Sequence, residues 1–257
     1  MKKINISITG ALGKMGKILI SRIQKNKNFK LISLTDLKYG KKINGIVIEK
    51  NTLKAFKEID VIIDFSRPKA SLEILNYAKN LKKKVVIGTT GFTKQQNNLI
   101  KNYSKKIAIF KSGNMSLGIN LLEYIVNILS EKIPSDYHIG INDDHHRKKV
   151  DYPSGTALML ANAVSKGKNK NLDSIKGKTF LNKKGNLQKN KINFFITRKG
   201  NTIGKHSVLF NNKIENIELK HTAFSRELFA DGAFNAAIWV SKKNKGLFNM
   251  QDMFNLK

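Results

Sequence analysis

Residues 4–16 read Ile-Asn-Ile-Ser-Ile-Thr-Gly-Ala-Leu-Gly-Lys-Met-Gly, and this stretch decides the fold. Its first six residues form a short apolar run that is typical of a β-strand. Gly10, Gly13 and Gly16 follow at a spacing that lets a backbone turn tightly and approach a pyrophosphate. The helix-like run after them would offer free N–H groups and a positive dipole end. The stretch favours a dinucleotide loop over the alternative, a glycine-rich turn that merely joins a strand to a helix.

The rest of the first half repeats this alternation of strand and helix. Strand-like runs recur at Lys30–Asp36, Asp60–Phe65, Lys84–Ile87 and Ile107–Phe110. Between them lie helix-like stretches at about 13–26, 68–82 and 93–104. Short β-rich runs that alternate with helical ones predict a doubly wound parallel sheet, the Rossmann-like form of the α/β class.

The second half has a different pattern. Apolar residues recur at helical spacing over 116–131, which predicts a long connecting helix. Four strand-like runs then follow with few helices between them, at Tyr137–Ile141, Ile192–Arg198, Lys205–Phe210 and Ile214–His221. They predict a second sheet of another kind. The stretch 165–191 is rich in Lys, Asn and Gly and predicts a mobile surface connection with one or two short elements. A last helix fits Ser225–Ser241.

The formal net charge of +30 suggests a polyanionic partner at first sight. The 257 residues contain 43 Lys but only 5 Arg, together with 29 Asn. Arg makes most of the bidentate contacts to phosphates and guanines, so a nucleic-acid-binding protein would be expected to use more of it. We interpret most of the charge as a compositional bias toward A- and T-rich codons and expect no specific nucleic-acid partner.

Two absences exclude other classes. The chain contains no Cys, which excludes disulfides, thiolate zinc sites, iron–sulfur clusters and a Cys nucleophile. No apolar run approaches the roughly 20 residues that span a bilayer, and the N-terminal apolar stretch is too short for a signal peptide. The expectation is a cytoplasmic protein without a membrane partner.

Asp36, at the end of the second predicted strand, suits the hydroxyls of an adenosine ribose. Its charge would repel a 2′-phosphate and so favours NADH. Lys14 and Lys38 lie nearby in sequence and can offset that repulsion, so NADH and NADPH both remain open.

Because ligands bind at the carboxyl ends of parallel strands, later loops should face the same cleft. These are Asp64–Arg67, the loop of Gly88, Thr89 and Thr90, and the loop of Ser112, Gly113, Asn114 and Met115. Each also fits an ordinary turn.

The stretch 143–157 carries the second motif. His145 and His146 stand beside the cations Arg147, Lys148 and Lys149. The mutual repulsion of such a cluster requires water or an anionic partner, which argues against a place in the core. Pro-Ser-Gly-Thr at 153–156 then opens an apolar helix-like run, and a helix N-terminus can hold a carboxylate. The pattern indicates a dianion pocket beside an imidazole, or else a solvated basic loop. We expect no metal, because adjacent His lack helix-face spacing and cations crowd them.

The run His-His-Arg-Lys-Lys-Val-Asp at 145–151, with Pro-Ser-Gly-Thr-Ala at 153–157, resembles the signature of the 4-hydroxy-tetrahydrodipicolinate reductase (dihydrodipicolinate reductase) family. The resemblance covers nearly the whole chain. It implies a dinucleotide-binding domain made of 1–115 and 226–257. It also implies a central α+β domain at 116–225, whose open mixed sheet binds substrate and builds a homotetramer.

The resemblance further implies an NAD(P)H-dependent enzyme of the diaminopimelate route to lysine. That enzyme reduces a cyclic dicarboxylate imine derived from hydroxy-tetrahydrodipicolinate, with loss of water. By similarity, His145 is the proton donor or acceptor and Lys149 is the second proton donor. The substrate-binding residues would be His146, Ser154, Gly155 and Thr156. The cofactor-binding residues would be Gly10, Ala11, Leu12, Gly13, Lys14, Met15 and Asp36, with Gly88, Thr89, Thr90, Ser112, Gly113, Asn114 and Met115.

Several positions depart from the family pattern. Leu37 stands where a basic residue commonly follows the ribose-binding acid, and Lys148 where the family often has His. The family's Gly-rich, Arg-bearing segment corresponds here to the Lys- and Asn-rich run 182–190. Whether the segment 165–191 closes over the substrate is therefore undecided from the sequence. A different Rossmann oxidoreductase, acting on an amino-acid semialdehyde, would share the first motif but not the second. Many such enzymes use a Cys nucleophile, which this chain lacks.

Overall fold

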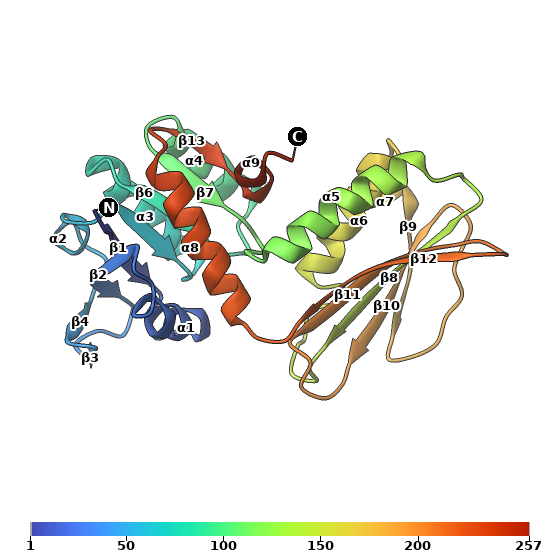
Figure 1. The fold of residues 1–257 in the computed structure, drawn as a ribbon, viewed down its shortest axis with the longest axis horizontal. Helices are drawn as coiled ribbons and strands as arrows, with labels where there is room; N and C mark the ends of the chain where they lie inside the picture. The colour runs from blue at the N-terminus through green and yellow to red at the C-terminus, as the bar shows by residue number, and fades with distance from the viewer. Residues whose placement is uncertain (1, 257) are drawn as a thin grey trace. The chain divides into compact units, whose positions relative to one another are not determined.

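The computed structural model describes residues 2–256, which form two compact units (Figure 1). Unit 1 combines Met1–Ser116 with Arg226–Lys257, and unit 2 is Leu117–Ser225. Met1 and Lys257, the outermost residues of the predicted dinucleotide-binding domain, lie outside the described residues. Within 2–256, every helix is too short or too polar to cross a bilayer.

Unit 1 contains an eight-stranded sheet in the order β13-β7-β6-β5-β1-β2-β4-β3. All neighbouring strands are parallel except the short pair β3 and β4, which confirms the predicted parallel sheet. The strands are β1 (Ile4–Thr9), β2 (Phe29–Thr35), β3 (Lys42–Ile43), β4 (Ile46–Glu49), β5 (Val61–Asp64), β6 (Lys84–Ile87), β7 (Ala108–Lys111) and β13 (Gly246–Phe248).

Helices cover both faces of this sheet, as in a doubly wound α/β fold. One hydrophobic cluster packs α1 and α8 against the sheet, and another packs α2, α3 and α4 against it. Local sequence fixes some of the helix starts: Thr93 and Gln96 form a capping box at α4, and Pro68 occupies the first turn of α3. The helices are α1 (Lys14–Ile23), α2 (Leu53–Phe56), α3 (Pro68–Asn80), α4 (Lys94–Ser104), α8 (Glu227–Ser241) and α9 (Met250–Phe254).

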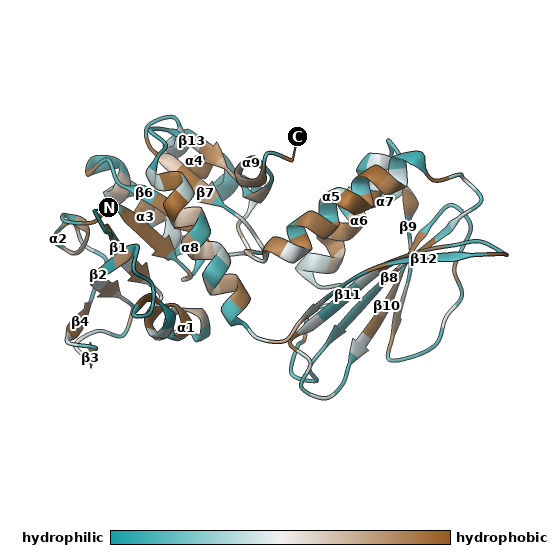
Figure 2. Cartoon of the chain, in the orientation of Figure 1, coloured by the Kyte–Doolittle hydropathy of each residue, from teal (hydrophilic) through white to brown (hydrophobic). Residues whose placement is uncertain are grey.

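Unit 2 contains a five-stranded mixed sheet in the order β12-β11-β8-β10-β9. β10 runs parallel to β8 and β9, whereas β11 runs antiparallel to β8 and β12. Figure 1 shows the helices of this unit on one side of the sheet, and Figure 2 shows their apolar residues in brown. The elements are α5 (Leu117–Lys132), β8 (His138–His145), α6 (Gly155–Gly167), α7 (Leu172–Ile175), β9 (Lys176–Leu181), β10 (Ile192–Arg198), β11 (Gly204–Asn211) and β12 (Asn216–Ala223).

The structure extends the predicted pattern at several places. The antiparallel pair β3 and β4 and the short elements α2, β13 and α9 were not expected, because their apolar runs are only a few residues long. Within 165–191 the short elements are α7 and β9, and β9 joins the sheet at its edge. β8 reaches His145, four residues beyond the predicted end, because polar residues occupy its last half.

Candidate active site

The glycine loop of unit 1 connects β1 to the N-terminus of α1. Gly10 has φ of +70°, and a Cβ there would lie 2.3 Å from the carbonyl oxygen of Phe65. A Cβ on Gly16 would lie 2.2 Å from the carbonyl oxygen of Gly10. Both positions therefore require glycine because backbone packs closely against them, and Gly10 requires it also for its positive φ. The result is a tight backbone turn that leads into a ten-residue helix.

Asp36 ties the end of β2 to this loop. Its Oδ2 accepts a hydrogen bond of 2.9 Å from the amide of Leu12, and its Oδ1 accepts one of 3.3 Å from the amide of Lys38. The carboxylate is thus fixed beside the loop, where it can accept hydrogen bonds from ribose hydroxyls. A cavity of about 360 Å³ opens here, lined by Gly10, Leu12, Gly13, Asp36, Leu37, Lys38, Asn51, Phe65, Ser66, Arg67 and Ala70.

The predicted cofactor residues differ in how they relate to this cavity. Gly10, Leu12, Gly13 and Asp36 line it. Ala11, Met15 and Met115 instead pack into or against the hydrophobic core, so any cofactor contact from them would come from the backbone. Lys14 is exposed at the start of α1.

The two later loops follow β6 and β7, at the carboxyl ends of neighbouring strands. Gly88 packs against the ring of Phe65, which leaves no room for a side chain. Thr89 is buried and donates a 3.0 Å hydrogen bond to Asp64, and Thr90 is exposed. Ser112 donates to the carbonyl oxygen of Asn114, which closes the turn that holds Gly113. These loops lie at one edge of the sheet but outside the residues that line the cavity.

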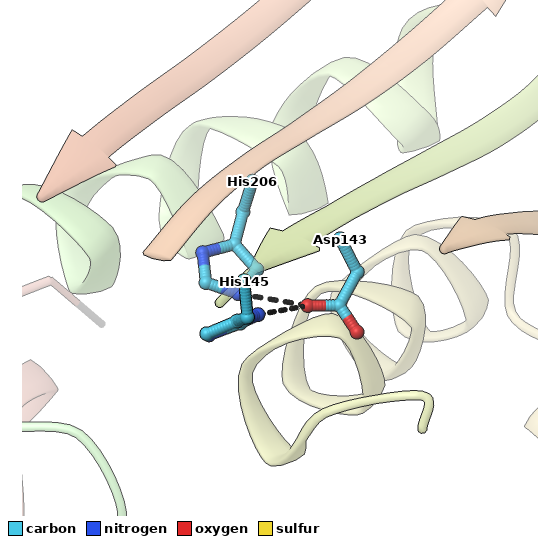
Figure 3. Close-up of side chains that lie close together, drawn as sticks. All are labelled: Asp143, His145 and His206. Carbon is cyan, nitrogen blue, oxygen red and sulfur yellow. Dashed lines mark ion pairs between the residues drawn. The ribbon is translucent and has the colours of Figure 1, made fainter. Parts of the chain in front are cut away.

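Strand register in unit 2 brings the second set of residues together. On β8, Asp143 and His145 are two residues apart and both are buried. Asp143 pairs in register with His206 on β11, and His145 pairs with Arg198 on β10. The Oδ1 atom of Asp143 lies 2.9 Å from Nδ1 of His145 and 3.3 Å from Nε2 of His206 (Figure 3).

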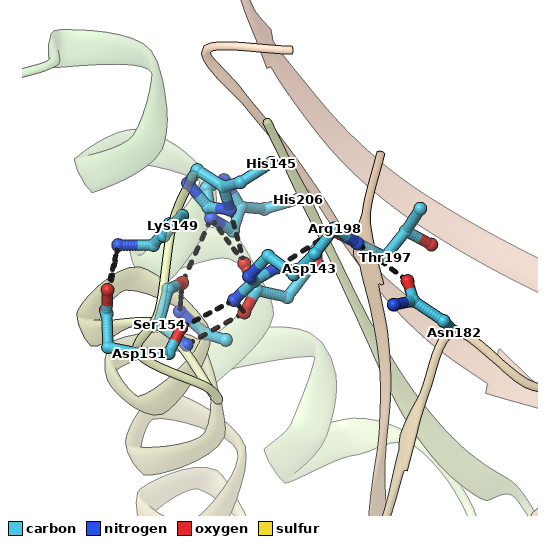
Figure 4. A network of polar contacts seen from close by, with 10 residues as sticks. Asp143, His145, Lys149, Asp151, Ser154, Asn182, Thr197, Arg198 and His206 are labelled. Atoms are coloured by element: carbon cyan, nitrogen blue, oxygen red, sulfur yellow. Dashed lines mark hydrogen bonds and ion pairs between the residues drawn. The ribbon is translucent and has the colours of Figure 1, made fainter. Parts of the chain in front are cut away.

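The other oxygen of Asp143 is held by two donors. Its Oδ2 accepts 2.8 Å and 2.9 Å hydrogen bonds from the amide of Ser154 and from Nη2 of Arg198 (Figure 4). Burial alone would raise the pKa of the Asp143 carboxyl. The imidazoles of His145 and His206 act against burial, and the Ser154 amide and Arg198 do so as well. Together they hold the pKa of Asp143 well below its ordinary range, so it is an anion.

Three members of this cluster, Asp143, Arg198 and His206, were missed in the sequence. Arg198 and His206 each stand alone on a strand, far along the chain from the motif that contains His145. The sequence pattern that could have identified Arg198 and His206 is a polar residue on the inward face of an otherwise apolar strand. Burial lowers the pKa of the His206 imidazole, and the neighbouring Asp143 offsets part of that effect. The expectation that the cationic motif lies away from the core is therefore wrong for His145, whose exposed fraction is 8%.

The remaining residues of the motif lie on the loop between β8 and α6. Nζ of Lys149 lies 2.8 Å from both carboxylate oxygens of Asp151. This contact and a smaller effect of Arg198 hold the pKa of Asp151 below its usual value against the opposing effect of burial. His146 donates its backbone N–H to the carbonyl oxygen of Thr202, and its buried Nδ1 makes no hydrogen bond to any described residue.

Ser154, Gly155 and Thr156 form the N-terminus of α6. Ser154 caps the helix: its hydroxyl accepts from the amide of Ala157, while its own amide donates to Asp143. Gly155 is exposed, and the space around its Cα is open. The helix therefore begins with its dipole end next to the Asp143 cluster, a position where backbone N–H groups can receive an anion.

By donor type, Asp143, His145 and His206 can hold a metal ion, since their ligand atoms all lie within 4.8 Å of one another. Two observations favour a proton site instead. Arg198 already neutralises the carboxylate, and Nδ1 of His145 lies 2.9 Å from Oδ1, close enough for a proton between them. The absence of a metal stays a prediction.

Comparisons with known proteins agree in one family. Residues 4–115 match the family model described as dihydrodipicolinate reductase, N-terminus, and residues 118–254 match the one described as dihydrodipicolinate reductase, C-terminus. The chain is 51% identical to a 4-hydroxy-tetrahydrodipicolinate reductase of Pelagibacter ubique, with 100% of both chains covered. It is 45% identical to one of Buchnera aphidicola from Cinara cedri, covering 98% of this chain and 97% of the relative. A solved dihydrodipicolinate reductase from Paenisporosarcina with dipicolinate bound shares the fold, at a TM-score of 0.79, 22% identity and coverage of 98% and 99%.

Proposed function

The chain belongs to the dihydrodipicolinate reductase family, NAD(P)H-dependent oxidoreductases of the diaminopimelate route to lysine, and from that premise we propose how its residues perform the reaction. The substrate is hydroxy-tetrahydrodipicolinate, which loses water to give a conjugated cyclic imine with two carboxylates. A hydride and a proton are then added, and the product is tetrahydrodipicolinate. Unit 1 binds the dinucleotide and unit 2 binds the dicarboxylate.

The glycine loop and Asp36 hold the cofactor, which is NADH or NADPH. The fit rests on the close backbone packing at Gly10 and Gly16, which keeps side chains away from the place of a pyrophosphate, and on the α1 N-terminus beyond it. Asp36 accepts hydrogen bonds from the ribose, and Lys38 and Arg67 line the same cavity as cations that can offset its charge. The loops at 88–90 and 112–115 complete the site on the nicotinamide side. When bound, the reduced nicotinamide supplies the hydride.

The substrate dianion is bound by the start of α6 and by two residues of the preceding loop, His146 and Lys149. The Gly155 and Thr156 amides receive one carboxylate at the positive end of the helix dipole, and Ser154 holds that end in place. His146 binds the second carboxylate, and Lys149 neutralises its charge. Without substrate, Lys149 forms an ion pair with the carboxylate of Asp151. When the substrate binds, its carboxylate takes the place of Asp151 as the partner of Lys149.

His145 supplies the proton. A hydride that adds to a conjugated imine leaves an electron pair, and a proton must reach that site. The single observation that carries this role is the 2.9 Å contact of His145 Nδ1 with the buried carboxylate of Asp143, which orients the imidazole. Lys149 is the second proton donor: it protonates the hydroxyl group that leaves as water, and the ring gives up one proton in the same step. The positive charge of Lys149 also stabilises the electron density that develops on the ring.

Assembly and location complete the proposal. We infer a homotetramer in the cytoplasm, where the pool of reduced dinucleotide is available, and no specific nucleic-acid partner. The excess of Lys over Arg supports the last point. Light scattering of the purified chain tests the tetramer. A titration of RNA binding against salt tests whether the chain has a specific nucleic-acid partner, since nonspecific attraction disappears at physiological ionic strength.

The reaction is tested by following NADH oxidation with freshly generated hydroxy-tetrahydrodipicolinate. The wild type should turn over, and His145→Gln should lose a factor of roughly 100 to 10 000 in kcat, the range of a general acid. His138→Gln, at the opposite end of β8, is the matched control and should keep the wild-type rate. No turnover by the wild type contradicts the activity, and an unaffected His145→Gln contradicts the role of His145.

A further inference from the structure

The two oxygens of the Asp143 carboxylate face different partners. Oδ2 is held by the Ser154 amide and by Arg198. Oδ1 faces the imidazoles of His145 and His206 at ion-pair distance and makes no aligned hydrogen bond within the described residues. One oxygen therefore anchors the group to the fold, and the other is directed at the proposed proton donor.

We propose that Asp143 is a positioning residue that keeps a proton on Nδ1 of His145, so that Nε2 is the nitrogen that exchanges a proton with the substrate. The inference rests on the proposed role of His145 as proton donor. The two atoms lie 2.9 Å apart without the alignment of a full hydrogen bond. An ionised carboxylate offers only lone pairs, so it attracts a proton on the nitrogen that faces it and repels a lone pair there. The neutral ring then has its lone pair on Nε2, and the imidazolium has its second proton there.

The surroundings of Nε2 agree with this assignment. Gly204 lies beside it on β11, where a Cβ would approach Nε2 to 3.2 Å. The glycine therefore leaves space at the nitrogen that has to meet a ligand, whereas Nδ1 is buried against the carboxylate. Figure 3 shows the ring of His145 with one nitrogen turned toward Asp143.

Several charged and titratable groups surround His145. Asp143 faces it from its own strand, and His206 faces it from β11 with ring centroids 4.9 Å apart. Burial lowers the pKa of His206, so that ring stays neutral near neutral pH. From β10, Arg198 acts on Asp143, while the ion pairs Lys149–Asp151 and Asp144–Lys205 flank the cluster.

Arg198 fixes which oxygen points to the imidazole. Its Nη1 donates to the carbonyl oxygen of Asp143 at 2.7 Å, and Nη2 donates both to Oδ2 and to the carbonyl oxygen of Asp151 at 2.8 Å. The guanidinium is nearly buried, with 6% of the side chain exposed. It joins the strand that carries His145 to the loop that carries Lys149, so the carboxylate cannot rotate without loss of these bonds.

This asymmetry predicts the effect of Asp143→Asn. Arg198 and the Ser154 amide are both donors, so the carboxamide must place its oxygen at the Oδ2 position. Its NH2 group then points at His145 and donates to Nδ1, which moves the ring proton to Nε2. The amide NH2 disfavours a second proton on Nδ1, and a neutral ring with its only proton on Nε2 is too weak an acid to give it to the substrate. A fall in kcat of about 10⁴ has been the cost of such a change of tautomer in a Ser-His-Asp triad.

The test combines nitrogen NMR of histidine-labelled full-length protein with steady-state kinetics. In the wild type, neutral His145 should carry its proton on Nδ1. In Asp143→Asn the proton should move to Nε2, and kcat should fall by about 10³-fold or more while KM changes little. Asp143→Glu should restore the Nδ1 proton and part of the rate. Asp144→Asn, the neighbouring carboxylate outside the cluster, should leave both unchanged.

The outcomes separate the two proposals. A wild-type ring protonated on Nε2, or an Asp143→Asn variant that keeps the Nδ1 proton, overturns the positioning role, and the wild-type spectrum decides even if the variant does not fold. If Asp143→Asn moves the proton but keeps the wild-type kcat, the positioning by Asp143 is supported and the proposed role of His145 fails.

Discussion

The glycine loop of unit 1 and the Asp143 cluster of unit 2 prepare for their proposed ligands by different means. The loop works by shape, because Gly10 and Gly16 let backbone pack where no side chain fits. The cluster works by side-chain chemistry, because strand register brings a carboxylate, a guanidinium and two imidazoles from three strands into one buried group. Changes in the loop should therefore affect cofactor binding, and changes around the cluster should affect the rate of the chemical step.

The largest effect is expected at Lys149. Lys149→Ala removes a proposed proton donor and the charge that faces the dianion, so kcat should fall by roughly 100- to 10 000-fold. Lys148→Ala is the control, because its side chain is exposed on the same loop and should retain the wild-type rate. Steady-state NADH oxidation measures both variants, and an unchanged rate in Lys149→Ala removes this residue from the mechanism.

The second prediction concerns the glycine loop, which Gly10→Ala should distort. The φ of +70° and the 2.3 Å approach to Phe65 should together weaken NADH binding by about tenfold or more, given about 1–2 kcal/mol of backbone strain alone. Gly40→Ala is the matched control: its φ is +91°, but its surroundings are open, so it reports the strain without the clash. Fluorescence titration with NADH measures both. Equal affinity in Gly10→Ala and wild type would contradict the shape argument.

A smaller effect concerns acid stability. Burial lowers the folded-state pKa of His206 below its ordinary value of 6.5, so between these two pKa values the unfolded chain binds more protons. The free energy of unfolding should therefore be highest above about pH 6.5 and should fall as the pH decreases toward the folded-state pKa of His206. His221, whose pKa burial also lowers, adds to the same slope. Urea titrations between pH 5 and 7 should show a shallower slope in His206→Gln, whereas an identical slope would contradict the buried, neutral state of this ring.

The smallest expected effect is that of a chelator. Arg198 neutralises Asp143, so the trio of Asp143, His145 and His206 should work without a metal. Dialysis against EDTA should leave the rate of NADH oxidation within about twofold, since no step of the proposed chemistry needs a Lewis acid. Loss of activity that is recovered on adding Zn²⁺ would show that the trio is a metal centre.

The two regions also differ in how much of them sequence could predict. The unit 1 site is local: strand, glycines and helix are contiguous, and Asp36 follows at the end of the next strand, where its carboxylate accepts from Leu12. The parallel sheet follows from the same regular alternation. The cavity residues Asn51 and Arg67 are harder to assign, because they lie on loops that carry no residue pattern of their own.

The cluster in unit 2 depends on long-range pairing that single-sequence patterns do not contain. The polar run at 142–145 hides the end of β8, so His145 was expected on a loop although it is in a strand. Arg198 and His206 are brought to it by register across three strands, 53 and 61 residues further along the chain. Motif similarity identified His145 and Lys149 as candidates, but only the fold supplies the buried anion that faces His145.

The central claim is that His145 transfers a proton during reduction rather than merely shaping the site. Single-turnover reduction of hydroxy-tetrahydrodipicolinate by NADH, compared between wild type and His145→Gln at saturating substrate, tests it most directly. The account predicts a rate at least about 100-fold slower in the variant, with KM changed by only a few fold. A single-turnover rate equal to that of the wild type, or a loss expressed only in KM, would contradict it.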